Sequence, residues 1–155
     1  MQIIYLNYFL ASIIAYLGLL IGIILIRLAP EEQRPGKKYF VLLKKILFFL
    51  ILVFLLFFYK INIILSLALL VIVIALMSNK KINLRKSALV YFLLGIIFYL
   101  SYFSEIIDLF VMESVLIFLY GIPAASLDLK KKNYPIVFMK NLWFFVPVIV
   151  LYFIL

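Results

Sequence analysis

The stretch YFVLLKKILFFLILVFLLFFYKINIILSLALLVIVIALMS, residues 39–78, decides how this chain folds. It is almost continuously apolar, and as one helix it would be about 60 Å long at a rise of about 1.5 Å per residue. The hydrocarbon core of a bilayer is about 30 Å thick, about half that length. The stretch therefore predicts two helices joined by a turn. The turn is expected at residues 59–62, with the sequence YKIN, because these residues are the strongly polar part of the stretch.

The composition of the whole chain agrees with a membrane protein. Of 155 residues, 70% are hydrophobic and 14% are charged, whereas a soluble domain is about 45–50% apolar. The excess apolar surface must face lipid, so the lipid bilayer is the expected partner. The chain has no cysteine and no histidine, which excludes disulfides, thiol catalysis and thiolate or imidazole metal sites. The sequence predicts no cofactor and no metal.

Extending the same argument along the chain predicts an all-α fold, a polytopic transmembrane bundle of six short spans in a single domain over residues 1–155. The spans are expected at residues 3–28, 42–59, 61–78, 87–103, 106–126 and 135–155. Pro30, Pro35 and Gly36 are expected to break any helix in the first loop. The first span lacks a basic start and is too long for a signal peptide, so it is interpreted as a retained span.

The basic residues sort onto alternate loops of this six-span arrangement. They are Arg27, Arg34, Lys37, Lys38, Lys44 and Lys45 around the first loop, Lys80, Lys81, Arg85 and Lys86 in the third, and Lys130, Lys131, Lys132 and Lys140 around the fifth. Only Lys60 falls elsewhere. Because cytoplasmic loops carry excess Lys and Arg, these three loops are predicted to be cytoplasmic and both termini non-cytoplasmic. Orientation explains the net charge of +9, and no nucleic-acid partner is expected.

The segments that begin at Lys37, Lys80 and Lys131 resemble one another. Each has a lysine pair, a short interval, another cation and then an apolar span. The chain could therefore consist of three helical hairpins in parallel orientation, as parallel repeats occur in some transporters. The alternative is that any cytoplasmic loop is lysine-rich and any span is rich in Leu, Ile and Phe.

A stripe of small residues runs along the first span. Ala11, Ala15, Gly18 and Gly22 follow one another at steps of four, three and four, which places them on one helix face. Small residues allow helix backbones to approach closely in lipid. The stripe predicts packing against a neighbouring helix of the same chain, and the alternative is the face of a homo-oligomer.

Glu113 is the main candidate for a functional residue. It lies about eight residues, or about 12 Å, into the fifth span, and an acidic side chain at that depth is costly and marks a functional site by default. Asp108 and Glu105 lie nearer the outer boundary, on an acidic side of the same helix. Groups at a similar depth on other spans are Tyr8, Ser12, Ser66 and the backbone freed at Pro147. Ion or substrate binding is the functional interpretation, and a hydrogen-bonded interhelical contact is the structural one.

Two further features have both a functional and a structural interpretation. Gly121, Pro123 and Pro147 are expected to interrupt the fifth and sixth spans, and broken helices form binding sites in transporters, although kinks without function are commoner. The lysine pairs could bind lipid headgroups. These candidates are Lys37, Lys38, Lys80, Lys81, Lys131 and Lys132.

The sequence contains no GxSxG, HExxH or Walker motif, and no catalytic residue is predicted. Three hypotheses follow in order of preference. The first is a small transporter or channel-type protein with an interior acidic site near Glu113. The second is a non-enzymatic membrane subunit or scaffold that packs against a membrane-protein partner or a second copy. The third is a lipid-modifying membrane enzyme that uses Asp128 and the nearby lysines.

Overall fold

The computed structural model describes residues 2–78, 87–128 and 134–154, and the described residues are helical except for short turns near residues 29, 59–62 and 104–106. The elements are α1 (Gln2–Leu28), η1 (Pro30–Glu32), α2 (Gln33–Phe58), α3 (Ile63–Ser78), α4 (Ser87–Phe103), α5 (Ile107–Asp128), α6 (Tyr134–Asn141), η2 (Leu142–Phe144) and α7 (Phe145–Ile154). The all-α helix bundle predicted from the sequence is confirmed.

Four helical segments are long and apolar enough to cross a membrane. They are Asn7–Leu28, Pro35–Phe58, Ile107–Leu127 and Pro135–Ile154. The apolar helices Ile63–Ile72 and Ala88–Phe103 are shorter. Leucine, isoleucine and phenylalanine side chains cover much of the outside of these helices, as expected where lipid replaces water. The helices therefore support an integral membrane protein.

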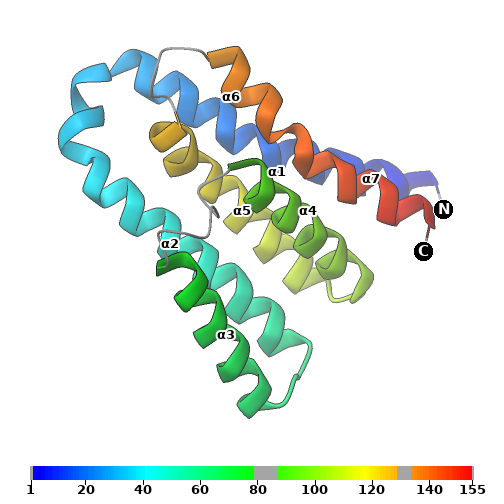
Figure 1. Ribbon diagram of the computed structural model, residues 1–155. Coiled ribbons are helices and arrows are strands. Elements are labelled where there is room, and N and C mark those ends of the chain that lie inside the picture. The colour runs from blue at the N-terminus through cyan, green and yellow to red at the C-terminus, as the bar shows by residue number, and fades with distance from the viewer. Residues whose placement is uncertain (1, 79–86, 129–133, 155) are drawn as a thin grey trace.

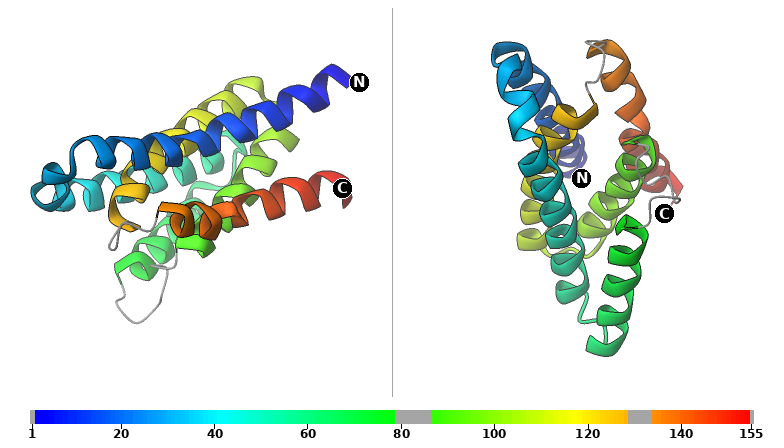
Figure 2. Two further views of the ribbon diagram at one scale, coloured as in Figure 1. Left: turned by 90° about the horizontal axis from the view of Figure 1, so that it is seen from above. Right: turned by 60° about the vertical axis from the view of Figure 1, so that its left-hand side comes forward.

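Helix α5 lies at the centre of the bundle and packs against α1, α2 and α4. Helix α4 packs in turn against α6, η2 and α7 on its other side. Helix α3 projects away with the end of α2, and its main packing partner in the described chain is α2 (Figure 1). Both chain termini lie at the same end of the bundle (Figures 1 and 2). We call this the termini end and the opposite end, where η1 lies, the η1 end.

The closest helix pair, α1 and α5, runs parallel. Tyr8 contacts Phe110 near the termini end, and Gly22 approaches Ile122 and Ala125 near the η1 end. Both helices therefore run toward the η1 end.

Helix α4 is also parallel to the segment formed by η2 and α7, because Phe92 contacts Trp143 of η2 and Tyr102 contacts Tyr152 of α7. Helix α4 is antiparallel to α1, since Tyr8 near the start of α1 contacts Phe98 and the later residue Tyr16 contacts the earlier residue Tyr91. The directions match three parallel hairpins, but the main packing of α1 is against α5 rather than against its hairpin neighbour α2. The repeat itself stays a prediction.

The small-residue stripe of α1 forms this α1–α5 contact. A Cβ atom added at Gly18 would overlap the carbonyl oxygen of Phe118, and one added at Gly22 would lie 2.6 Å from the carbonyl oxygen of Ile122. Ala15 is buried and Ala11 is partly buried against the core. The stripe packs within the chain as predicted, and α5 occupies the face that the alternative assigned to a second copy.

Two turns lie where the sequence places them, and each uses a left-handed residue that is not glycine. Lys60 has φ 51° and Glu105 has φ 57°. The backbone N–H of Lys60 donates to the carbonyl of Phe57, and that of Glu105 donates to the carbonyl of Tyr102. The polar turn at residues 59–62 therefore ends α2, as the length of the apolar stretch requires.

The first loop is shorter than predicted. Helix α2 begins at Gln33, so the expectation that Pro35 and Gly36 break the helix is wrong. The first backbone N–H groups of a helix have no intrahelical acceptor, so a proline in the first turn removes no hydrogen bond. The apolar part of α2 is consequently preceded by additional helical turns that carry Lys37 and Lys38.

The interruption expected in the fifth span is absent from the described helix, because α5 continues through Gly121 and Pro123. The sixth span is interrupted, but at the 3-10 turn Leu142–Phe144 just before Pro147. A proline cannot donate to the carbonyl four residues earlier, which favours the tighter turn at that point. A Cβ at Gly95 of α4 would overlap the Phe144 carbonyl oxygen, so the turn lies directly against α4.

Candidate functional site

Glu113 is fully buried in the bundle, with 0% of its surface exposed. Neither carboxylate oxygen has a hydrogen-bond partner among the described residues. Buried polar groups are nearly always hydrogen-bonded because burial without a partner costs free energy. An acid kept without a partner at this depth is therefore a strong candidate for a binding site.

The position of Glu113 on α5 follows from the helical repeat. Leu109, Glu113, Ile117, Tyr120 and Ala124 are all buried and follow at steps of four, four, three and four, which forms one stripe. We call it the α5 stripe. Its member Tyr120 contacts Phe48 of α2 and Tyr91 of α4. The α5 stripe therefore faces the region between α2 and α4.

The helix register places Ser12 of α1 at the depth of Glu113. On α1, Ser12 lies between Tyr8 and Gly18, which contact residues on either side of Glu113 in α5. Ser12 is buried, and its hydroxyl donates to the carbonyl of Phe9 at 2.8 Å.

The break between α6 and α7 lies in the same layer. Tyr91 of α4 contacts Tyr120, and Phe98 contacts Phe110, so Gly95 lies near the depth of Glu113. Gly95 is also where the 3-10 turn approaches α4. The acid, the serine and the helix break thus share one layer of the bundle, and broken membrane helices often line binding sites.

An aromatic cluster closes the bundle on the termini side of Glu113. Tyr8 lies at its centre, with ring centroids 5.3 Å from Phe98, 4.6 Å from Tyr102 and 4.8 Å from Tyr152. The Tyr8 hydroxyl donates to the carbonyl of Val148 at 3.0 Å. Phe110, three residues before Glu113, completes the cluster. We call these five residues the outer aromatic layer.

A second aromatic cluster lies on the η1 side. Tyr16 and Tyr91 have ring centroids 6.1 Å apart, Tyr91 and Tyr120 are 6.0 Å apart, and Phe48 and Tyr120 are 6.2 Å apart. We call these four residues the inner aromatic layer. Glu113 lies along α5 between Phe110 and Tyr120, so one aromatic layer separates it from each end of the bundle.

Lys44 adds a positive charge to the inner aromatic layer. It is half-buried on α2, and its ammonium nitrogen lies 5.6 Å from the centroid of the Tyr120 ring. The neighbouring Lys45 is exposed. Cations within about 6 Å of an aromatic centroid are attracted by the ring. Of this adjacent pair, only Lys44 turns toward α5.

The other predicted acids and serines lie away from Glu113. Asp108 and Glu105 are exposed, at the start of α5 and in the turn before it. Ser66 lies on α3, which projects from the bundle, and its hydroxyl donates weakly to the carbonyl of Ile61 at 3.4 Å. The structure therefore brings Ser12, but not these three, to the depth of the buried acid.

The predicted headgroup contacts are only partly described. Lys37 and Lys38 are exposed on the first turns of α2, where headgroups could reach them. The remaining candidates lie outside the described residues: Lys80, Lys81, Lys131 and Lys132. The side chain of Asp128, named for the enzyme hypothesis, also lies outside them.

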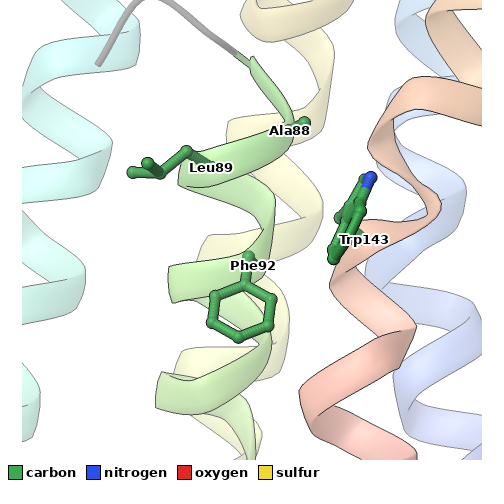
Figure 3. Close-up of a pocket in the computed structure, with 4 residues that line it drawn as sticks. All are labelled: Ala88, Leu89, Phe92 and Trp143. Atoms are coloured by element: carbon green, nitrogen blue, oxygen red, sulfur yellow. The ribbon is translucent and has the colours of Figure 1, made fainter. Parts of the chain in front are cut away.

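The described residues contain no group of three or more His, Cys, Asp or Glu side chains that could hold a metal ion. A groove of about 410 Å³ lies between α4 and η2, lined by Ala88, Leu89, Phe92 and Trp143 (Figure 3). Figure 3 shows Trp143 standing opposite Ala88 and Phe92. None of the four lining residues is ionisable, so this groove is not the ion site.

Sequence reasoning missed the inner aromatic layer and its lysine. One signal was available, because Tyr120 follows Glu113 by seven residues and so lies on nearly the same helix face. Comparison with protein families, curated protein sequences and solved structures gives no match for this chain. The functional argument therefore depends on the geometry alone.

Proposed function

We propose that this chain is a small membrane transport protein that binds and passes protons at Glu113. The observation that carries the proposal is the fully buried carboxyl group without a hydrogen-bond partner, enclosed between two aromatic layers. Ionisable residues in membrane interiors are rare and mark ion paths and proton relays. A site closed on both sides also suits a carrier that opens to one end at a time.

The proton suits this site better than a metal cation does. A calcium or magnesium ion takes about six or more oxygen ligands, whereas Glu113 offers two. The described residues bring no cluster of further acids to it.

The topology that we propose has six crossings, with the η1 end cytoplasmic and both termini outside. The parallel course of α1 and α5 supports it, because α2, α3 and α4 then supply three crossings between them. The exposed lysines of the first turns of α2 lie at the η1 end, as the positive-inside rule requires. Helices α3 and α4 are short for a 30 Å core, and local thinning of the bilayer accommodates such spans.

The test is proton uptake into sealed vesicles that contain the purified protein and a trapped pH-sensitive dye, driven by a potassium diffusion potential. Glu113→Gln keeps the side-chain shape and removes the titratable carboxyl proton, so we expect uptake to fall to the rate of protein-free vesicles. Asp108→Asn is the matched control, because Asp108 lies on the same helix but is exposed, and we expect wild-type uptake. Unchanged uptake in Glu113→Gln would contradict the proposal.

The second candidate is a membrane subunit or scaffold, and α3 is the observation that favours it. Ile63, Ile64 and Leu67 of this helix are 74%, 75% and 57% exposed, and α3 packs within the described chain mainly against α2. Lipid alone can cover this surface, which is why we rank the subunit second. Co-purification of a stable partner, lost when Ile64 is replaced by tryptophan, would favour it over transport.

A further inference from the structure

We propose that protons reach Glu113 from the η1 end along the seam between α2 and α5, and that Tyr120, held in place by Lys44, closes this seam. The inference rests on the proposed function, because it assigns the entry route and the gate of the same site. The inference adds to the proposed function by naming one pair of residues, Lys44 and Tyr120, whose contact controls the access of protons to Glu113.

Two other contacts near Glu113, the α1–α5 seam and the contact between α4 and η2, leave little room for a path. The α1–α5 seam brings Gly18 against the backbone of Phe118. The contact between α4 and η2 brings Gly95 against the backbone of Phe144. Backbones in such close contact separate only if whole helices move apart.

The α2–α5 seam differs from these two contacts, because large side chains rather than backbones meet across it, as they also do between Tyr91 and Tyr120 across the α4–α5 seam. On the α2 side, Leu47, Phe48 and Ile51 are buried. Of the four long apolar segments, the one in α2 is the least buried within the chain. Side chains can rotate without moving the helices, so this seam can open at a lower cost than the two backbone contacts.

Tyr120 is placed to close the seam. Its side chain is fully buried and contacts both Phe48 of α2 and Tyr91 of α4. It lies two helical turns from Glu113 on the η1 side of the α5 stripe. A rotation of the Tyr120 ring away from α2 would therefore open the way toward Ile117 and Glu113.

The contact with Lys44 stabilises the closed position of the ring. The ammonium lies 5.6 Å from the ring centroid, and a partly desolvated cation–π contact of this kind shifts an equilibrium about 2- to 30-fold. A lysine at this position could also simply extend toward the headgroups. Lys45 is the next residue along α2 and is exposed. It carries the same charge but is placed away from the Tyr120 ring, and it therefore supplies the matched control.

The experiment measures the access of a thiol reagent to the seam. The chain has no cysteine, so Ile117→Cys, which lies between Glu113 and Tyr120, introduces a single buried reporter. The protein is held in lipid nanodiscs, where both faces meet the solvent, and is labelled with a methanethiosulfonate that carries a negative sulfonate. The negative charge of the reagent separates two effects. Removal of the positive charge of Lys44 weakens the attraction for the reagent and on its own would slow labelling. A faster reaction therefore reports opening of the seam.

We expect Lys44→Met to raise the labelling rate of the reporter about 2- to 30-fold and Lys45→Met to leave it unchanged. Tyr120→Leu removes the ring and should raise the rate as Lys44→Met does, whereas Tyr120→Phe retains the ring and should not. Leu116→Cys, partly buried beside the stripe, is the second reporter if Ile117→Cys disturbs folding. Helical circular dichroism and a single elution peak check each variant.

Equal labelling rates for Lys44→Met and Lys45→Met would overturn the gate, as would equal rates for Tyr120→Phe and Tyr120→Leu. The labelling experiment does not depend on proton flux. Loss of the Lys44 effect with intact flux at Glu113 would therefore remove the gate and leave the proposed function. Unchanged flux in Glu113→Gln would remove the entry route for protons whatever the labelling rates are.

Discussion

Gly18→Ala should destabilise the protein by about 2–3 kcal/mol, because the new methyl group has no space. A Cβ at this position overlaps the carbonyl oxygen of Phe118, and the Cα and carbonyl carbon of that residue are also close. These are backbone atoms, so no side chain can rotate away. The α1 and α5 helices must therefore separate along their contact, which is the most extensive in the bundle.

The magnitude follows from the dispersion energy that this separation loses. Each pair of atoms in contact gains about 0.1–0.2 kcal/mol of dispersion energy, and a gap of about 0.5–1 Å loses a quarter to a half of that energy. With on the order of 50 atom pairs across the contact, the loss is ~3 kcal/mol. The higher helix propensity of alanine returns about 1 kcal/mol at most.

Reversible unfolding in mixed micelles, titrated with a denaturing detergent, measures this loss. The single tryptophan, Trp143, reports unfolding by fluorescence, and circular dichroism reports the helices. Gly36→Ala is the matched control, because its added Cβ meets the ring of Phe40, which can rotate. We expect the control to stay within about 1 kcal/mol of the wild type. If Gly18→Ala unfolds at the same midpoint as the control, the proposed contact between α1 and α5 is wrong.

Three further predictions use the same unfolding assay. Gly95→Ala should cost about 2–4 kcal/mol and shift the emission of Trp143, because its methyl group overlaps the Phe144 carbonyl in the neighbouring 3-10 turn; an unshifted spectrum would argue against that packing. Tyr8→Phe should cost about 1–2 kcal/mol by leaving the Val148 carbonyl without its donor, and a neutral result would show that the hydrogen bond is absent. Glu113→Met should raise stability by at least about 1 kcal/mol, because it removes an unpaired acid from the interior; a loss of stability would indicate a hidden partner.

The features of the fold that depend on hydropathy could be predicted from the sequence. The turn at residues 59–62 follows from the thickness of a bilayer and from one polar point in a long apolar stretch. The helix of residues 87–103 begins and ends where predicted. The start of α2 could not be predicted in this way, because Pro35 is compatible with both a loop and the first turn of a helix.

The packing partners could not be predicted, because residue spacing shows which helix face is small and not which helix meets it. The stripe at Gly18 and Gly22 gave the correct face of α1, but nothing local identifies α5 as its neighbour. Glu113 was visible as a charge within an apolar segment. The role of Lys44 could not be predicted, because the sequence does not show which of the neighbours Lys44 and Lys45 faces Tyr120 of α5.

The partnership of α1 with α5 also constrains the order of events during synthesis. Helix α1 ends at Leu28 and α5 ends at Asp128, so about 100 residues must be made before the two can meet. At roughly 5–20 residues per second this takes about 5–20 s. During that interval α5 is absent, so the glycine face of α1 faces lipid or the insertion machinery, and a nascent chain released before residue 107 cannot bury this face against α5. Such fragments are expected to be substrates for membrane quality control.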